Sequence, residues 1–217
     1  FRDPRGYIIS ADQDDFPTVV KFVNVLQKGG VEVHKATAGF TVAGKTYPVG
    51  SYVVRADQAF RPAVIDSFEA QDHPMDLAYP GGPPVPPYDI TGWTVASQMG
   101  IQFDRVLDGF TGPFQPIGFN LEAPQAAQVS GPASPAGWLV SHKINDSFIV
   151  MNRLLKAGAD VYWLKQEQTV AGHGLGTGTL WIPASAVSKP IVERAARELG
   201  VPAYGVAQAP KGEAMKL

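Results

Sequence analysis

The sequence contains no cysteine among its 217 residues. This absence excludes disulfide bonds, thiolate metal sites and cysteine nucleophiles. It leaves the cellular compartment open, because a protein without disulfides is stable on either side of a membrane. An excess of basic residues is also missing, since 18 Lys and Arg face 20 Asp and Glu and the net charge is −2. Nucleic-acid binding depends on basic side chains that neutralise phosphates, so we do not expect nucleic acid as a partner.

Long apolar runs are absent as well. No run approaches the roughly 20 residues that a bilayer crossing requires, so the sequence predicts no membrane span. The chain starts with FRDPRGYIIS, which has neither an initiator Met nor a signal-peptide pattern, and we expect a soluble piece of a longer protein. The composition itself is that of a globular protein, with 45% hydrophobic and 18% charged residues.

The sequence repeats itself at a distance of 128 positions. Between residues 22–64 and 150–192, 13 of 43 positions are identical without a gap. The clearest match is the string TVAG, which occupies Thr41–Gly44 and returns at Thr169–Gly172. This similarity predicts that one folding unit is present twice.

Each half has the same pattern of apolar residues. The runs YIIS and GWLVS predict buried strands, and FPTVVKFVNVLQKGG and NDSFIVMNRLLKAG predict helices that end at glycine. The strands expected in VEVHKA and ADVYWLK follow at a spacing that suits a βαβ unit. A hairpin, a helix and a final strand complete each half. We therefore predict an α/β fold with doubly wound, mainly parallel sheets, built from two duplicated βαβ-hairpin-α halves.

The composition of the intervening segments predicts the domain boundaries. Residues 73–89 hold six of the 19 prolines and should form an extended surface loop. Residues 123–135 have the composition of a linker. The first half is thus expected at 1–122 and the second at 136–217, either as two domains or as one continuous domain.

Polar residues follow the first expected strand of each half. In doubly wound sheets ligands bind beyond the carboxyl ends of the strands. This rule predicts a ligand-binding crevice formed by Ser10, Asp12, Ser141, His142 and Lys143. The alternative is that the acidic residues near these positions cap helices, where a negative charge is favourable.

A second candidate surface is aromatic. Tyr79, Tyr88 and Trp93 cluster around the proline-rich loop. Such side chains are common at docking surfaces, and they are equally common as anchors of a long loop on a core. Both interpretations stay open.

No catalytic or metal site is predicted in this chain. The four histidines lack the His and Glu three residues apart that zinc carboxypeptidases need, and no G-x-S-x-G string marks a serine nucleophile. The glycine-rich segment GHGLGTG leads into an expected strand rather than a helix, so it predicts a hairpin turn and not a phosphate loop.

Four long strings carry a resemblance to a known family. FRDPRGYIIS, FPTVVKFVNVLQKGGVEVHKAT, YPVGSYVVRADQAFRPAVIDSFEAQDHP and YPGGPPVPPYDITGW resemble the C-terminal region of bacterial proteins in the carboxypeptidase A-like zinc metallopeptidase family. The similarity extends through most of the chain and is densest before Asp108. In such proteins a zinc peptidase domain comes first and a region similar to class I glutamine amidotransferases, with a flavodoxin-like fold, follows.

The resemblance implies a role without catalysis for this chain. The zinc ligands belong to the preceding peptidase domain, so no catalytic residue and no cofactor is carried over, and the cysteine of an amidotransferase is missing. The leading hypothesis is an accessory module that packs on that peptidase domain or on a second copy of itself, or that presents substrate. The resemblance favours an extracytoplasmic or secreted location.

Two further hypotheses remain. The alternative is a binding module for a small molecule, a peptide or a glycan in the crevice near Asp12 and His142. An independent serine or carboxylate hydrolase ranks last.

Overall fold

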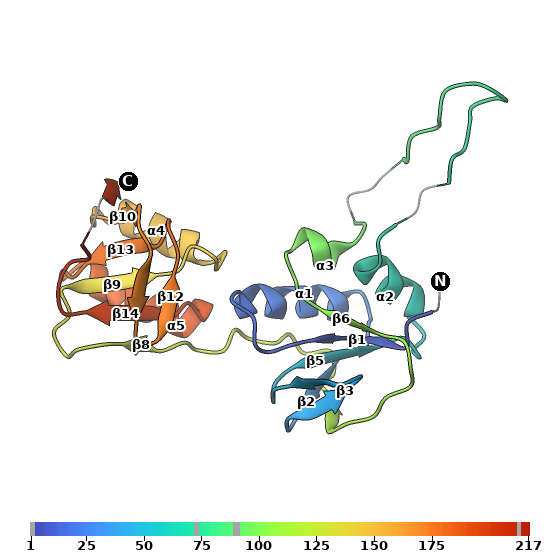
Figure 1. Ribbon diagram of the computed structural model, residues 1–217, viewed down its shortest axis with the longest axis horizontal. Coiled ribbons are helices and arrows are strands. Elements are labelled where there is room, and N and C mark those ends of the chain that lie inside the picture. Colours follow the sequence, from blue (N-terminus) through green and yellow to red (C-terminus); the bar gives the residue numbers. More distant parts are fainter. Residues whose placement is uncertain (1–2, 72–73, 89–91, 212–213) are drawn as a thin grey trace. The chain divides into compact units, whose positions relative to one another are not determined.

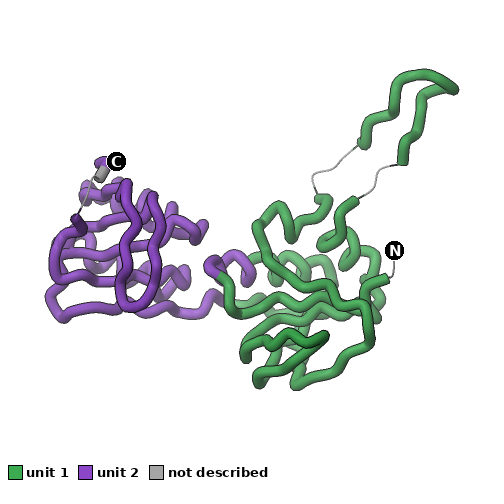
Figure 2. The backbone as a smooth tube through the Cα atoms, in the orientation of Figure 1, with its two compact units in different colours: residues 1–13, 21–122 green, residues 14–20, 123–217 purple. Residues whose placement is uncertain are grey.

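The computed structural model describes residues 3–71, 74–88, 92–211 and 214–217. The chain folds into two compact units, which Figure 2 shows in different colours. Unit 1 consists of residues 1–13 and 21–122, and unit 2 consists of residues 14–20 and 123–217. Each unit has its own sheets and its own core.

The described residues between 3 and 122 form ten helices and strands; Figure 1 labels most of them. They are β1 (Gly6–Ile9), α1 (Phe16–Lys28), β2 (His34–Ala36), β3 (Phe40–Val42), β4 (Lys45–Tyr47), β5 (Tyr52–Arg55), α2 (Arg61–Phe68), α3 (Val95–Gln98), β6 (Asp104–Val106) and β7 (Phe114–Pro116). The first five residues of α1 are assigned to unit 2.

The remaining elements belong to unit 2. They are β8 (Val129–Ser130), β9 (Gly137–Val140), α4 (Ser147–Lys156), β10 (Tyr162–Leu164), β11 (Gln168–Val170), β12 (His173–Leu175), β13 (Leu180–Pro183), α5 (Ser188–Leu199), β14 (Ala203–Val206) and β15 (Ala214–Lys216). None of the helices in the described ranges has the length and the apolar character that a membrane span requires.

The main sheets of the two units have the same strand order. In unit 1 the order is β6-β1-β5-β2-β7, and in unit 2 it is β14-β9-β13-β10-β15 with β8 added beyond β14. All pairings in the first sheet are antiparallel. In the second sheet only the pairing of β8 with β14 is parallel among the described residues.

The prediction of a doubly wound, mainly parallel sheet is therefore wrong. Strand β1, helix α1 and strand β2 do form a βαβ unit, but β5 lies between the two strands and is antiparallel to both. Likewise β1 lies between β5 and β6, the strands that precede and follow α2. Such interleaving of two βαβ units defines the ferredoxin-like arrangement. Short strands made only of apolar residues are buried on both faces of their sheet, which is typical of parallel sheets. In this protein such strands belong to antiparallel sheets.

The main sheet of each unit is covered by helices on one side and by a small hairpin on the other, with apolar residues packed on both sides. Figure 1 shows this arrangement most clearly for unit 1. On the helix side of unit 1, the ring of Tyr7 stacks on Phe68 at 4.2 Å, and Phe22 contacts Phe68 edge-on at 5.2 Å. On the hairpin side, Ile8 and Val53 pack with residues of β3 and β4. Unit 2 repeats both clusters with different side chains.

The repeated TVAG strings form equivalent two-residue hairpins. In the first hairpin Val42 pairs with Lys45, and Ala43 and Gly44 have φ angles of 49° and 78°. In the second, Val170 pairs with His173, and the two turn residues have φ angles of 50° and 82°. Positive φ at both central positions is the requirement of a type I′ turn, which matches the twist of the adjoining strands.

Alanine is strained at the first position of such a turn, and this predicts a stabilising substitution. Ala43→Asn and Ala171→Asn are each expected to raise the free energy of unfolding by about 0.5 kcal/mol, because Asn tolerates a left-handed conformation better than Ala. Urea denaturation measures this change. Gly44→Ala is the control and should lower the free energy of unfolding by about 1 kcal/mol. A loss of stability in both Asn variants would contradict the turn assignment.

Two tyrosines of the unit 1 sheet carry charged partners at their hydroxyl ends. Tyr7 donates to Glu69 at 2.5 Å, and Arg105 donates to the same carboxylate oxygen at 2.7 Å. Tyr52 donates to Glu122 at 2.9 Å, and Lys35 pairs with that carboxylate at 2.7 Å. Burial and the hydrogen bond to glutamate both raise the pKa of each tyrosine well above its ordinary value of 10.0.

These tyrosines predict a loss of stability in alkali. A pKa that is higher in the folded than in the unfolded chain contributes stability that is fully present below pH 10 and is lost as the pH rises through the folded pKa. The free energy of unfolding from urea denaturation should therefore fall from pH 10 to pH 12, and Tyr7→Phe should make the fall shallower. Phe103→Leu is the control in the same cluster, since it removes no ionisable group. An equal slope in Tyr7→Phe and in the unaltered protein would contradict this account.

Candidate functional site

The residues predicted to form a strand-end crevice follow the equivalent strands β1 and β9. Ser10 and Asp12 belong to unit 1, whereas Ser141, His142 and Lys143 belong to unit 2. The crevice was expected because the carboxyl ends of parallel strands meet at one edge of a sheet. Neighbouring strands of an antiparallel sheet end at opposite edges, so this reason for expecting a crevice does not apply.

Both serines take part in local turns. The hydroxyl of Ser10 accepts the N–H of Asp12 at 3.2 Å, and that of Ser141 accepts the N–H of Lys143 at 3.3 Å. His142 packs against the turn at Gly178, where an added Cβ would lie 3.4 Å from its Nδ1. Lys143 forms an exposed ion pair with Asp14 at 3.0 Å. The serine contacts are local turns, and none of these contacts assembles a nucleophile with a base.

The helix-cap alternative holds for one of the nearby aspartates. Asp15 precedes α1, and its carboxylate accepts the N–H of Thr18 at 3.2 Å and the Thr18 hydroxyl at 2.7 Å. Asp146 precedes α4, but its side chain makes no hydrogen bond to the N-terminus of that helix.

The three aromatic residues near the proline-rich loop differ in exposure. Tyr79 is 63% exposed and Tyr88 fully exposed, whereas Trp93 is half-buried. Between residues 74 and 88 the chain doubles back, with a bridge between Leu77 and Pro84. The loop ends predicted at His73 and Asp89 lie outside the described residues. The exposure of the two tyrosines does not fit the interpretation of all three aromatics as loop anchors.

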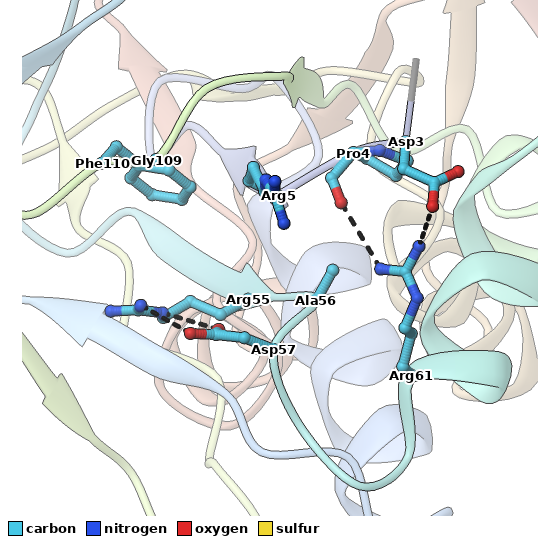
Figure 3. Close-up of a pocket in the computed structure, with 9 residues that line it drawn as sticks. All are labelled: Asp3, Pro4, Arg5, Arg55, Ala56, Asp57, Arg61, Gly109 and Phe110. Carbon is cyan, nitrogen blue, oxygen red and sulfur yellow. Dashed lines mark hydrogen bonds and ion pairs between the residues drawn. The ribbon is translucent and has the colours of Figure 1, made fainter. Parts of the chain in front are cut away.

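A pocket with three arginines lies in unit 1 and was not predicted from the sequence. Its volume is about 640 Å³, and Figure 3 shows its lining. The lining residues are Asp3, Pro4, Arg5, Arg55, Ala56, Asp57, Arg61, Gly109 and Phe110. We call this the arginine pocket. It forms where β1 begins and β5 ends, because Gly6 pairs with Arg55 in the antiparallel sheet.

Two of the three arginines are paired with aspartates. Arg55 binds Asp57 through two hydrogen bonds of 2.9 and 2.7 Å, which hold the pKa of Asp57 below its usual range. Arg61 pairs with Asp3 at 3.0 Å. Among the described residues no acidic side chain forms an ion pair with Arg5, which is exposed. In the view of Figure 3 the Arg5 side chain lies between Phe110 and the pair of Asp3 with Arg61.

Unit 2 contains the same backbone geometry without the arginines. The N–H of Arg5 donates to Val106 at 2.7 Å, and the N–H of Ala136 donates to Val206 at 2.7 Å. The carbonyl of Arg5 accepts from Ala56 at 2.9 Å, as that of Ala136 does from Ala184 at 2.8 Å. Ala136 is thus the structural equivalent of Arg5.

The second arginine is also replaced in unit 2. Pro183 pairs with Gly137 as Arg55 pairs with Gly6, so Pro183 stands where unit 1 has Arg55. A pocket of unit 2 that includes Ala136 and Pro183 is apolar, and its other lining residues are Tyr162, Leu164, Trp181, Ala209 and Pro210. Since the same scaffold forms with alanine and proline at these two positions, the fold itself does not require Arg5 or Arg55.

The arrangement is suited to binding an anion. A guanidinium presents a planar fork of donors that matches a carboxylate or a phosphate, and Arg5 is available for this contact. Among the described residues no group of three or more His, Cys, Asp or Glu is placed to hold a metal ion. Comparisons of the chain with models of known protein families, with curated proteins and with solved structures give no match in any of the three.

A signal for the pocket is present in the repeat. When residues 22–64 are aligned with 150–192, Arg55 is aligned with Pro183. The two copies of the repeat thus differ at this position, with a charged residue in one and an apolar residue in the other. Arg5 lies outside that aligned stretch. Only the pairing of β1 with β5 brings the two arginines together.

This comparison predicts that Arg5 contributes little to stability. Arg5→Ala is expected to change the free energy of unfolding by less than about 0.5 kcal/mol, because the side chain is exposed and alanine occupies the equivalent place in unit 2. Its neighbour provides the contrast. An added Cβ at Gly6 would lie 2.8 Å from the carbonyl oxygen of Val54, so Gly6→Ala should cost about 1–3 kcal/mol. Chemical denaturation of both variants is the measurement, and a large loss in Arg5→Ala would assign the arginine a structural role.

Proposed function

We propose that this chain is a non-catalytic accessory module that binds an anionic group in the arginine pocket. The observation that carries the proposal is the difference between the two units at equivalent backbone positions. Unit 1 has Arg5 and Arg55 where unit 2 has Ala136 and Pro183. A charged cluster that the scaffold does not need is expected where a ligand is bound.

The electrostatics of the pocket support an anion. Three arginines and two aspartates in the lining leave one net positive charge. Arg5 carries that charge without an acidic partner among the described residues. An anion therefore gains a charge-assisted hydrogen bond there without first breaking an ion pair.

The resemblance of the N-terminal strings to zinc metallocarboxypeptidase proteins supports the accessory role. In a parent of that kind the module acts beside a peptidase domain, and a pocket for an anionic group suits the presentation of substrate. The flavodoxin-like fold that the resemblance implied is replaced by two ferredoxin-like units. The proposal therefore depends on the pocket and on the sequence strings, and not on an amidotransferase-like fold.

Titration with simple anions tests the proposal. Acetate and inorganic phosphate are added to the ¹⁵N-labelled chain, and backbone amide shifts are followed by NMR. The largest shifts are expected at Arg5, Ala56, Gly109 and Phe110. Arg5→Ala should weaken binding about tenfold or more, because a hydrogen bond to a charged group contributes about 1.5–3 kcal/mol.

Arg197→Ala provides the matched control. Arg197 is an exposed arginine of α5 in unit 2, so its removal changes the net charge by the same amount away from the pocket. This variant should bind as the unaltered chain does. Equal binding by Arg5→Ala and Arg197→Ala, or shifts scattered over both units, would refute an anion site in the arginine pocket.

A further inference from the structure

A second pocket adjoins the arginine pocket and shares Gly109 and Phe110 with it. Its volume is about 480 Å³. Thr41, Arg105, Asp108 and Thr111 contribute polar or charged side chains to its lining. Besides Phe110, the apolar side chains of the lining are Val42, Ala43, Val106 and Leu107. They come from the turn of the β3–β4 hairpin, from β6 and from the segment that follows β6. We call this the apolar pocket.

Phe110 lies at the boundary of the two pockets and is held there by packing. An added Cβ at Gly6 would lie 3.1 Å from the Phe110 ring, so the missing side chain of Gly6 lets the ring lie on β1. On the hairpin side the ring contacts Phe114 edge-on, with centroids 6.0 Å apart. One aromatic ring thus borders both a cationic and an apolar compartment.

We infer that the ligand is a carboxylate attached to an apolar group. The carboxylate is bound by Arg5 in the arginine pocket, and the apolar group lies against Phe110 in the apolar pocket. Free organic acids and the C-terminus of a peptide with an apolar last side chain share this chemistry. The inference rests on the proposed function and specifies its ligand class.

Charge favours a carboxylate over a phosphate. The lining of the arginine pocket has one net positive charge, which one carboxylate neutralises. A phosphate monoester has a charge of about −1.5 to −2 at pH 7 and would leave an excess of negative charge beside Asp57 and Asp3. Phosphate is also less suited because the forks of Arg55 and Arg61 already bind these aspartates.

Charge also sets the orientation of the ligand. Arg105 and Asp108 both line the apolar pocket, and their opposite charges leave no net charge there. The arginine pocket has one net positive charge, so the charged end of the ligand belongs in the arginine pocket. The equivalent place in unit 2 lacks arginine, which predicts one ligand per chain.

Four probes separate the contributions of the two pockets. They are 3-phenylpropionate, an acetylated tripeptide that ends in Phe with a free carboxylate, the same tripeptide with an amidated end, and acetate. Isothermal titration calorimetry measures affinity and stoichiometry. At least one of the two apolar carboxylates should bind about tenfold or more tightly than acetate, with one site per chain, because burial of an aromatic group adds to the anion contact. The amidated tripeptide should bind no more tightly than acetate does.

The two sources of the carboxylate are distinguished by the first two probes. Tighter binding of the tripeptide than of 3-phenylpropionate identifies a peptide C-terminus, and the reverse identifies a small organic acid. Either result supports the inference. Tight and equal binding of the amidated and free tripeptides overturns it, and so does binding of both apolar carboxylates no tighter than that of acetate.

Two variants test the apolar compartment. Phe110→Ala should reduce the affinity for the apolar carboxylates to that of acetate, because it removes the ring against which the apolar group lies. Because Phe110 contributes to the packing of unit 1, the half-exposed Leu107 provides a milder variant, and Leu107→Asn should lower the same affinities about threefold or more. Unchanged affinity in Leu107→Asn would overturn the inference.

The outcome also separates the inference from the proposed function. If acetate and phosphate bind at Arg5 as tightly as the apolar carboxylates do, the ligand class is wrong and the anion site stands. If no anion binds, both fail.

Discussion

The antiparallel pairing of β1 with β5 is the constraint on which the rest of unit 1 depends. This pairing inserts β5 between β1 and β2, so the sheet closes as two interleaved βαβ units. Its register places Gly6 opposite Arg55, and Arg5 is therefore brought beside Arg55 although 50 positions separate them in the sequence. The same register leaves Gly6 beneath the ring of Phe110. The cationic and apolar compartments both follow from one strand pairing.

Duplication makes it possible to separate what the fold needs from what it does not. The backbone hydrogen bonds at the start of β1 and of β9 are the same within 0.1 Å. The type I′ turns are also the same, and each uses Ala followed by Gly. Side chains differ at the ends of these strands, where unit 1 has Arg5 and Arg55 and unit 2 has Ala136 and Pro183. Features that the two units share are thus those that the fold requires. Positions at which they differ, such as Arg5 and Arg55, are free to differ between the two surfaces.

Local features could be predicted from the sequence, and the direction of the sheet could not. Apolar spacing and terminal glycines indicated the helices α1 and α4, and the repeated TVAG marked both hairpins. The partner of β1 was missed because runs such as YIIS are apolar on both faces in either kind of sheet, and nothing local states which strand lies beside it. The arginine pocket was missed for the same reason, since its members meet only through that long-range pairing. The crevice near Ser10 was inferred from a parallel edge that the fold lacks.

Tandem copies of one fold run the risk of exchanging strands while they fold, since each copy offers a template for the other. The aromatic side chains of the two sheets oppose such an exchange. Tyr7 and Tyr52 end at Glu69 and Glu122, whereas the equivalent Trp138 and Leu180 lie in an apolar cluster. A strand of unit 2 in the place of β1 or β5 would leave Glu69 or Glu122 without its hydroxyl donor. The hydrogen bonds of these tyrosine hydroxyls thus favour the pairing of β1 and β5 within their own unit.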